Sequence, residues 1–258
     1  MNGIVVDIGN TSTSLALWRG GRIGRVVTLA GKLKDVDAIE RAIGRVGKGV
    51  RLDGAMLSSV VPRINRMWLR SLARVTGVRP LLLTHRLDLG IAIDYPRPET
   101  IGTDRLADAA GAVGRFGAPV IVADFGTALT FNVVSATGAY LGGVIAPGLP
   151  LMTEYLAEKT ALLPKIALKG ACGPIGRSTV EAMRIGARVG YQGMVREILG
   201  HVRGGMGLKR ARLCATGGYA RWALRGSGLP FVIDPNLTLY GLGRILELNG
   251  VAPVGRRP

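Results

Sequence analysis

Residues 4–14 read IVVDIGNTSTS, and residues 121–130 read IVADFGTALT. Each stretch is an apolar strand pattern that ends in an acid, a glycine and a threonine, and in each a second strand pattern, a glycine-containing turn and a third strand follow. The equivalent acids, Asp7 and Asp124, are 117 residues apart, close to half of the 258-residue chain. A repeat of this length indicates a duplicated architecture. We therefore expect two similar lobes, each with a β-hairpin unit, that face each other across a cleft.

Strand and helix patterns alternate along the chain, which is typical of an α/β fold. We expect strands at 4–7, 13–18, 55–61, 80–84, 120–127, 213–218 and 231–234, helices at 36–43, 64–75, 149–159, 179–199 and 238–248, and a loop at 142–148. An alanine-rich helix is expected to start close to Asp104 and to end near Gly117. Because no linker is evident, the repeat alone places the boundary, and it predicts lobes of residues 1–117 and 118–258.

The composition excludes several classes of protein. Hydrophobic residues make up 48% and charged residues 20% of the chain, which is typical of a folded globular protein. We find neither a signal-peptide pattern nor an apolar run of roughly 20 residues, so we expect a cytoplasmic protein without a membrane segment. Two cysteines, Cys172 and Cys214, and two histidines, His85 and His201, are too few and too scattered for a disulfide framework or a metal cluster.

The formal net charge of +17 invites a nucleic-acid interpretation. The basic residues are mostly arginine and are spread along the chain, and aromatic residues make up only 5% of it, so a base-stacking surface is poorly supplied. We expect attraction for anionic ligands and no specific nucleic-acid partner.

The small residues that follow Asp7 are suited to binding phosphate groups. A turn such as Gly9–Ser14 lets backbone N–H groups and hydroxyls approach phosphate oxygens, because no bulky side chain blocks them. Asp7 beside it repels phosphate but can hold Mg²⁺ or its water shell against it. Neither GxxxxGK[ST] nor GxGxxG occurs in the chain. One such stretch alone could be a tight turn whose acid caps nearby amides, but two equivalent copies favour a nucleotide site.

Asp104 and Arg105 form a second group of interest, after the proline-containing loop 94–98 and at a helix start. The acid could simply stabilise the helix dipole beside a solvated arginine. Alternatively, the acid could accept a proton from a substrate hydroxyl while the arginine holds a carboxylate through two parallel hydrogen bonds. A kinase for a small hydroxy acid needs that pair.

Six motifs together resemble the type III pantothenate kinases. They are DIGNT at 7–11, SSVVP at 58–62, Tyr95 with IGTDR at 101–105, DFGTALTF at 124–131, GGVIAPG at 142–148 and TGGYA at 216–220. The resemblance runs from Ile4 to about Asn249. The duplicated hairpins are also similar to those of the wider superfamily of acetate and sugar kinases, heat-shock ATPases and actin, which implies two lobes of ribonuclease-H-like (actin-like ATPase) topology around a nucleotide cleft.

The resemblance implies ATP-dependent phosphorylation of pantothenate to 4'-phosphopantothenate, the first step towards coenzyme A. It assigns the ATP phosphates to Asp7, Ile8, Gly9, Asn10, Thr11, Ser12, Thr13 and Ser14, with Asp7 helping to place Mg²⁺ and Thr127 touching ATP. Asp104 would be the proton acceptor, and the pantothenate pocket would be lined by Tyr95, Gly102, Thr103, Arg105 and Thr179. Asp124 would hold a monovalent cation, K⁺ or NH₄⁺.

The resemblance further implies a homodimer whose substrate pocket is completed at the subunit interface. One departure is Asn132, where many members of the family have Asp. The amide keeps the hydrogen-bonding shape but loses the charge, so a cation contact there would weaken, and we assign Asn132 no catalytic role. Two alternatives stay open: an accessory transcriptional regulator that resembles this family but lacks kinase activity, and a related kinase that acts on another small hydroxy acid or a sugar.

Overall fold

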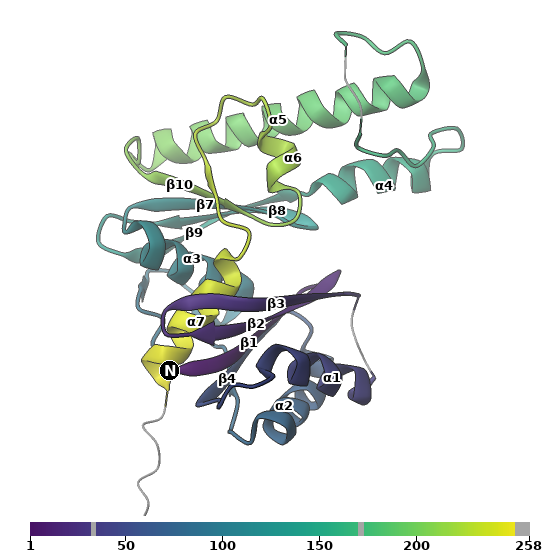
Figure 1. Ribbon diagram of the computed structural model, residues 1–258. Coiled ribbons are helices and arrows are strands. Elements are labelled where there is room, and N and C mark those ends of the chain that lie inside the picture. Colours follow the sequence, from purple (N-terminus) through teal and green to yellow (C-terminus); the bar gives the residue numbers. More distant parts are fainter. Residues whose placement is uncertain (32–34, 170–172, 251–258) are drawn as a thin grey trace, which may run out of the picture. The chain divides into compact units, whose positions relative to one another are not determined.

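The computed structural model describes residues 1–31, 35–169 and 173–250, and the chain divides into two compact units. The first unit comprises Met1–Ala118, Ala136–Leu141 and the chain from Asn236 onward, and the second comprises Pro119–Ser135 and Gly142–Pro235. We expected lobes of residues 1–117 and 118–258. The units differ from that division because the last helix, α7 (Leu237–Asn249), packs on the sheet of the first unit (Figure 1).

The first unit is built on a five-stranded sheet in the order β3-β2-β1-β4-β5. The strands are β1 (Asn2–Ile8), β2 (Ser12–Arg19), β3 (Arg22–Ala30), β4 (Gly54–Ser59) and β5 (Leu81–Leu82). β1 to β3 form the expected antiparallel meander, in which Gly20 and Gly21 take positive φ values of 50° and 83° at the turn. β4 pairs parallel with β1 and with β5.

Helices cover both faces of this sheet, which explains why β1 is a continuous apolar run. On one face, Ile4, Val6 and Ile8 pack into a core with α1 (Val36–Gly47) and α2 (Pro62–Thr76). On the other face, α7 contacts β1, β2 and β4. There the rings of Trp18 and Tyr240 meet edge to face, with their centroids 5.5 Å apart. The carboxyl end of β1 is thereby fixed between two packed layers.

The second unit repeats this plan. Its strands are β7 (Val120–Phe125), β8 (Ala128–Val134), β9 (Ala139–Pro147), β10 (Arg212–Thr216) and β11 (Val232–Ile233), although the start of β9, up to Leu141, belongs to the first unit. Their order, β11-β10-β7-β8-β9, repeats that of β5-β4-β1-β2-β3, with β7 and β8 antiparallel and β10 parallel to both β7 and β11. The helices of this unit are α4 (Leu149–Lys159), α5 (Thr179–Gly205) and α6 (Ala220–Leu224). The duplicated α/β fold predicted from the repeat is confirmed.

Some local predictions were wrong. The stretch 142–148, expected as a loop, continues β9 as far as Pro147, because only Gly142 in it departs from ordinary strand geometry, with a φ of 116°. Three short elements were not expected: β6 (Ala92–Ile93), which pairs with Ala139 and Tyr140, the 3-10 helix η1 (Pro98–Thr100), and α6. Elements of two to five residues carry too little periodicity to be recognised.

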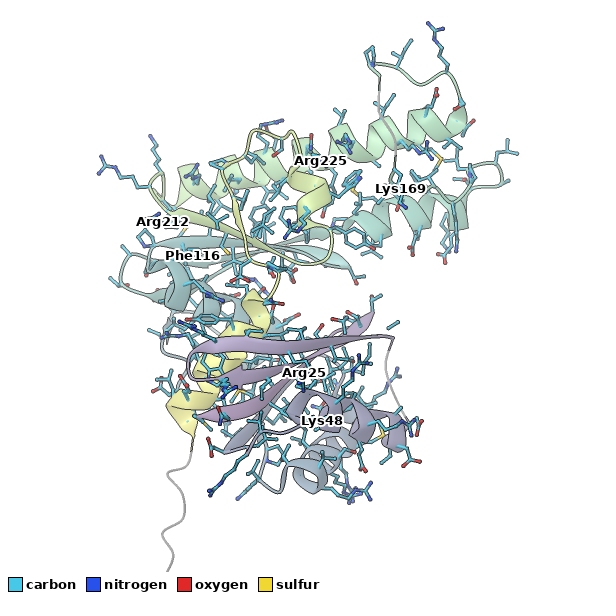
Figure 2. All side chains as sticks on the ribbon, in the orientation of Figure 1. Arg25, Lys48, Phe116, Lys169, Arg212 and Arg225 are labelled. Carbon is cyan, nitrogen blue, oxygen red and sulfur yellow. The ribbon has the colours of Figure 1, made fainter. Side chains whose placement is uncertain are left out.

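Basic side chains are spread over both units. Figure 2 labels Arg25 and Lys48 in the first unit and Arg212 and Arg225 in the second, and all four are exposed. The exposed basic residues are therefore not confined to one unit. Among the described residues, no helix is long and apolar enough to span a membrane.

Two helices of the first unit pack unusually closely, because glycines meet at their crossing. In α3 (Thr103–Phe116), a Cβ added to Gly111 would lie 2.6 Å from the carbonyl oxygen of Leu237, and one added to Gly241 in α7 would collide with the carbonyl of Ala107. Real Cβ atoms do not approach backbone this closely. The start of α3, which carries Asp104, is therefore positioned by α7.

We predict that Gly241→Ala destabilises the protein by about 1–3 kcal/mol, because the extra methyl group forces two helix backbones apart. The matched control is Gly44→Ala, in the exposed face of α1, where a Cβ would meet nothing within 4 Å. This control should stabilise by about 0.5–1 kcal/mol, since alanine restricts the unfolded chain. Urea unfolding midpoints measure both, and equal midpoints for the two variants would contradict the close packing.

Candidate active site

The first polar group to consider lies where β1 and β4 end side by side. Asp7 on β1 pairs in register with Ser58 on the parallel strand β4. Carboxyl ends of neighbouring parallel strands are where open α/β sheets bind their ligands. Ser58 donates a hydrogen bond that partly stabilises the Asp7 carboxylate. The small hydroxyl residues at this end of β4 thus belong to the same site as Asp7.

The same serines hold the start of α3. The hydroxyl oxygens of Ser58 and Thr103 are 3.0 Å apart, and the backbone N–H of Ser59 donates to Thr103 Oγ1 at 3.2 Å. A Cβ on Gly102, the residue that caps the helix, would lie 2.5 Å from Asp104 Oδ1, so only glycine leaves the carboxylate its place. These contacts fix Asp104 near the end of β1, within electrostatic reach of Asp7.

The charge of Asp104 acts on the carboxyl of Asp7. Burial, and secondarily the negative charge of Asp104, raises the pKa of Asp7 to about 7. Burial also raises the pKa of Asp104. Arg105 lowers it, through its charge and through its backbone N–H, which donates to Asp104 Oδ1 at 2.8 Å. An acid whose pKa is raised towards neutrality is a better proton acceptor than an ordinary surface carboxylate.

The Asp7 side chain fits a cation. Its Oδ1 is buried and has no hydrogen-bond partner in the structure. A buried carboxylate oxygen without a donor is costly, and a hard cation is the group that carboxylates bind best. Asp7 could therefore hold Mg²⁺, directly or through its water shell.

The turn after β1 is a tight hairpin turn that exposes polar residues. Gly9 N–H donates to Ser12 O at 3.0 Å, and Gly31 N–H donates to Thr11 O at 2.8 Å, while Asn10, Thr11 and Ser12 are exposed. Ile8 and Thr13 are fully buried, so their side chains face the core. For these two residues only the backbone is available to a ligand.

A third group in the first unit surrounds Tyr95. Its ring centroid lies 6.3 Å from that of Tyr140, and the Arg105 guanidinium carbon lies 5.8 Å from the Tyr140 ring centroid. Tyr140 itself is fully buried at the start of β9. The structure therefore brings Asp7, Tyr95, Gly102, Thr103, Asp104 and Arg105 into one unit around the end of β1 and the start of α3.

In the second unit, Asp124 takes the position that Asp7 has in the first. Asp124 pairs in register with Thr216 on the parallel strand β10, and Gly217 follows with a φ of 90°. A Cβ on Gly217 would touch Asp124 and would lie 2.5 Å from the carbonyl carbon of Phe125. Only glycine fits at this position, because the Asp124 carboxylate and the Phe125 backbone occupy the place of a side chain. Burial and the charge of Asp124 also raise the pKa of the buried Tyr191 hydroxyl on α5.

The remaining predicted residues also lie in the second unit. Thr127 lies in the turn between β7 and β8, and Thr179 is the first residue of α5. Asn132 is fully buried in β8 opposite Val122. Cys214 is buried in β10, whereas Cys172 lies outside the described residues.

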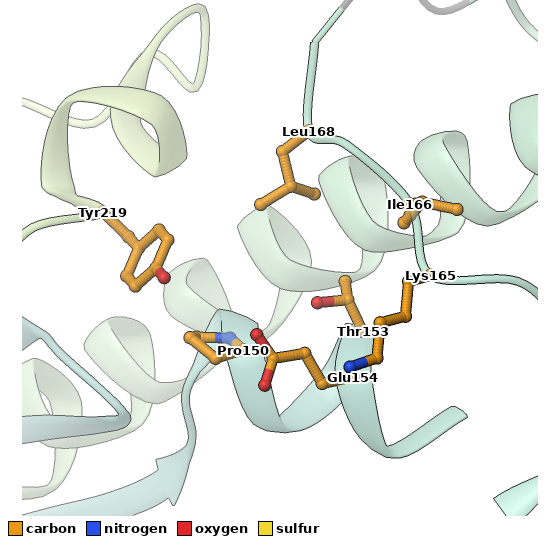
Figure 3. A pocket seen from close by; sticks show the side chains of 7 residues that line it. All are labelled: Pro150, Thr153, Glu154, Lys165, Ile166, Leu168 and Tyr219. Atoms are coloured by element: carbon orange, nitrogen blue, oxygen red, sulfur yellow. The ribbon is translucent and has the colours of Figure 1, made fainter. Parts of the chain in front are cut away.

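A pocket of about 280 Å³ lies beside the glycines that follow β10 (Figure 3). It is lined by Pro150, Thr153, Glu154, Lys165, Ile166, Leu168 and Tyr219. The N–H of Tyr219 donates to Phe125 O at 3.1 Å, so the pocket is tied to the end of β7. One aromatic ring with aliphatic neighbours and two charged residues can receive a flat, polar-edged ring.

Four residues in the sites of the two units were assigned no role in the sequence analysis: Ser58, Ser59, Tyr140 and Gly217. The usable signal was that Ser58–Ser59 and Thr216–Gly217 each follow an apolar strand, as Asp7 and Asp124 do. Nothing in the local pattern marked Tyr140, because its partners lie far away in sequence.

The chain matches a known family along most of its length. The family model for type III pantothenate kinase matches residues 3–201. A type III pantothenate kinase of Akkermansia muciniphila is 46% identical over 205 residues, covering 78% of this chain and 81% of that protein. Type III pantothenate kinases of Methylacidiphilum infernorum and Acidiphilium cryptum are each 38% identical, covering 95% and 98% of this chain and 88% and 97% of theirs.

Solved structures show the same fold. A ROK hexokinase of Thermus thermophilus matches with a TM-score of 0.55 and 15% identity, covering 95% of this chain and 98% of that one. A Baf family protein of Campylobacter jejuni matches with a TM-score of 0.61 and 16% identity, covering 95% and 97%. At these identities the likeness concerns the fold alone, which is the two-lobe actin-like type.

The raised pKa of Asp7 predicts how stability depends on pH. Asp7 ionises at about pH 7 in the folded protein and near 3.8 when unfolded, so the ligand-free folded state binds the extra proton between these values. Stability should therefore fall as the pH rises through this window. Asp7→Asn should remove the part of this fall that Asp7 causes and raise stability above pH 7 by on the order of a few kcal/mol.

Melting temperatures between pH 4 and 8, without Mg²⁺ or nucleotide, measure this effect. Glu247→Gln, at an exposed acid of α7, is the control and should leave the pH dependence unchanged. If Asp7→Asn melts with the same pH dependence as the unaltered protein, Asp7 carries no buried charge.

Proposed function

The chain belongs to the type III pantothenate kinase family, and we propose that it transfers the γ-phosphoryl group of ATP to the primary hydroxyl of pantothenate. The products are 4'-phosphopantothenate and ADP, which begins coenzyme A biosynthesis. One observation carries the assignment of roles: the start of α3 holds a half-buried acid with a raised pKa, Asp104, next to the arginine that a hydroxy acid substrate needs.

In this proposal Asp104 is the general base. Its carboxylate accepts the proton of the pantothenate hydroxyl as that oxygen forms a bond to the γ-phosphorus, while the bond from the γ-phosphorus to the bridging oxygen breaks and ADP leaves. The transition state is loose, so positioning and charge neutralisation contribute more than proton removal. Burial supports the role, because it raises the pKa of Asp104.

Arg105 is assigned to the substrate carboxylate, which its guanidinium can hold through two parallel hydrogen bonds. Tyr95 is assigned to the same pocket, as is Thr179 of the second unit. Thr103 is bonded to Ser58 and Ser59, which supports a role in holding the pocket wall. Gly102 leaves space for the Asp104 carboxylate.

Two groups of residues, one in each unit, are assigned to ATP and its cations. Asp7 to Ser14 would contact the phosphates, and Mg²⁺ held by Asp7 would neutralise the charge that develops on them. Thr127 would contact ATP, and Asp124 would hold K⁺ or NH₄⁺. The adenine base is assigned to the pocket beside Tyr219, whose aromatic and aliphatic lining suits a flat ring. We also propose that the reaction takes place in the cytoplasm, where ATP is present.

We further propose that the enzyme is a homodimer through the outer surface of α4 and α5. These two helices pack together in the second unit and expose several large apolar side chains: Leu151, Tyr155 and Leu156 of α4 and Val189 of α5, each between 43% and 63% exposed. Leu162, just after α4, is 89% exposed. Exposed apolar residues gathered in this way are typical of an interface.

We predict that Asp104→Asn lowers kcat by about 100-fold or more, because the amide cannot accept the hydroxyl proton. The KM for ATP should stay near that of the unaltered enzyme. The measurement is phosphopantothenate formed from ATP, Mg²⁺ and pantothenate, by mass spectrometry. Asp94→Asn, at an exposed acid of the loop before Tyr95, serves as the control. Full turnover by the Asp104 variant would remove Asp104 from the role of base.

The cation assignment is tested by the same assay with K⁺, NH₄⁺ or Na⁺ as the only monovalent cation. Product that needs K⁺ or NH₄⁺, and that Asp124→Asn no longer forms, supports the assignment. Equal product with Na⁺ would contradict it. If no cation gives product, the kinase assignment fails, and salt-dependent binding to DNA would then favour the regulator alternative.

Light scattering should report a mass of twice the 27.1 kDa chain. Tyr155→Asp should halve this mass, because a buried carboxylate opposes the apolar contact. Val75→Asp, at a comparable exposed valine of the first unit, is the control and should stay dimeric. A dimer that survives Tyr155→Asp together with Leu156→Asp would place the interface elsewhere.

A further inference from the structure

Tyr140 is a large buried side chain beside residues assigned to pantothenate, and the proposed reaction gives Tyr140 no role. It is fully buried at the start of β9, in the short segment 136–141 that belongs to the first unit. The Arg105 guanidinium carbon lies 5.8 Å from the centroid of its ring, and the ring of Tyr95 lies at 6.3 Å with an angle of 58° between the planes. One ring therefore contacts two of the residues assigned to pantothenate, Arg105 and Tyr95.

The backbone of the same residue holds the loop that carries Tyr95. Asp94 N–H donates to the carbonyl oxygen of Tyr140 at 2.9 Å, and Ile93 of β6 pairs with Tyr140 in parallel register. Ala92 N–H donates to Gly138 O at 3.2 Å. The short β6 strand thus exists through its pairing with residues 138–140, and Tyr95 follows two residues after this anchor.

We propose that Tyr140 is a positioning residue for the acid substrate, whose ring supports the Arg105 guanidinium and the Tyr95 ring in the arrangement that receives pantothenate. This inference rests on the proposed function, because it takes Arg105 and Tyr95 as substrate contacts. Tyr140 does not touch the substrate in this account. It sets substrate affinity through the two residues that do.

The ring face, and not the hydroxyl, is the part that acts. A guanidinium over an aromatic face is attracted by the ring's electron density, more strongly when both are withdrawn from water. Burial, together with the negative charges of Asp104 and Asp108, raises the pKa of the Tyr140 hydroxyl to about 12, although the charge of Arg105 opposes this. The hydroxyl therefore stays protonated at working pH and cannot serve as a base.

The first unit offers a matched control. Tyr240 on α7 also has an arginine over its ring, Arg115, whose guanidinium carbon lies 3.9 Å from the ring centroid, and an aromatic neighbour, Trp18. It is 8% exposed and belongs to none of the groups assigned to substrate. Removing either ring removes the same kinds of contact, but only Tyr140 supports the pantothenate residues.

The test compares Tyr140→Leu, Tyr140→Phe and Tyr240→Leu by steady-state kinetics and by calorimetric titration with pantothenate alone. Tyr140→Leu should raise the KM and the Kd for pantothenate by about 3- to 30-fold, with the KM for ATP changed less than about twofold. Tyr140→Phe keeps the ring and should stay within about threefold of the unaltered enzyme. Tyr240→Leu should lower the melting temperature without changing either pantothenate constant.

Three results would overturn the inference. These are an unchanged pantothenate KM in Tyr140→Leu, an equal rise in Tyr240→Leu, or a Tyr140→Phe defect as large as that of Tyr140→Leu. If Tyr140→Leu does not fold, Tyr140→Met, which fills similar volume without a ring, replaces it. An unaltered enzyme that neither binds nor phosphorylates pantothenate would instead refute the proposed function, so the two failures are distinct.

Discussion

The repulsion between two carboxylates, Asp7 and Asp104, is the interaction on which the first unit's site depends. Two partly buried acids within electrostatic reach of each other would normally separate or take up protons. Here they are held in place, because β1 lies between helix layers on both faces and α3 is tied to β4 through Ser58, Ser59 and Thr103. The surrounding fold thus maintains a negative site that a cation and a proton donor can relieve.

That constraint connects the fold to the chemistry. The charge of Asp104 adds to burial in raising the pKa of Asp7, whereas burial, against the stabilisation by Arg105, raises the pKa of Asp104. The second unit repeats the architecture without repeating the pair: Asp124 has Gly217 and Tyr191 as neighbours. The two units thus place an acid at an equivalent strand end but surround it with different neighbours.

The sequence predicted the parts of this arrangement that are local. The acids, the small-residue turn and the hairpin that follows each acid were predicted from the repeat, since a strand end and its turn are encoded within about ten residues. Contacts between segments that are far apart in the sequence could not be predicted from it. The bond from Ser58 to Thr103 spans 45 residues, and Tyr140 reaches Tyr95 and Arg105 from a different strand. The C-terminal helix gave no sign of which sheet it covers, because its buried residues surround it almost completely.

The most direct test of this account is a double-mutant cycle on the stability of the ligand-free protein, with Asp7→Asn, Asp104→Asn and both together, at a pH above 7. Each single change should stabilise the protein, and the double variant should gain less than the sum of the two, because either change alone already removes their repulsion. Gains that add fully, or single variants that lose stability, would contradict a buried and repelling pair.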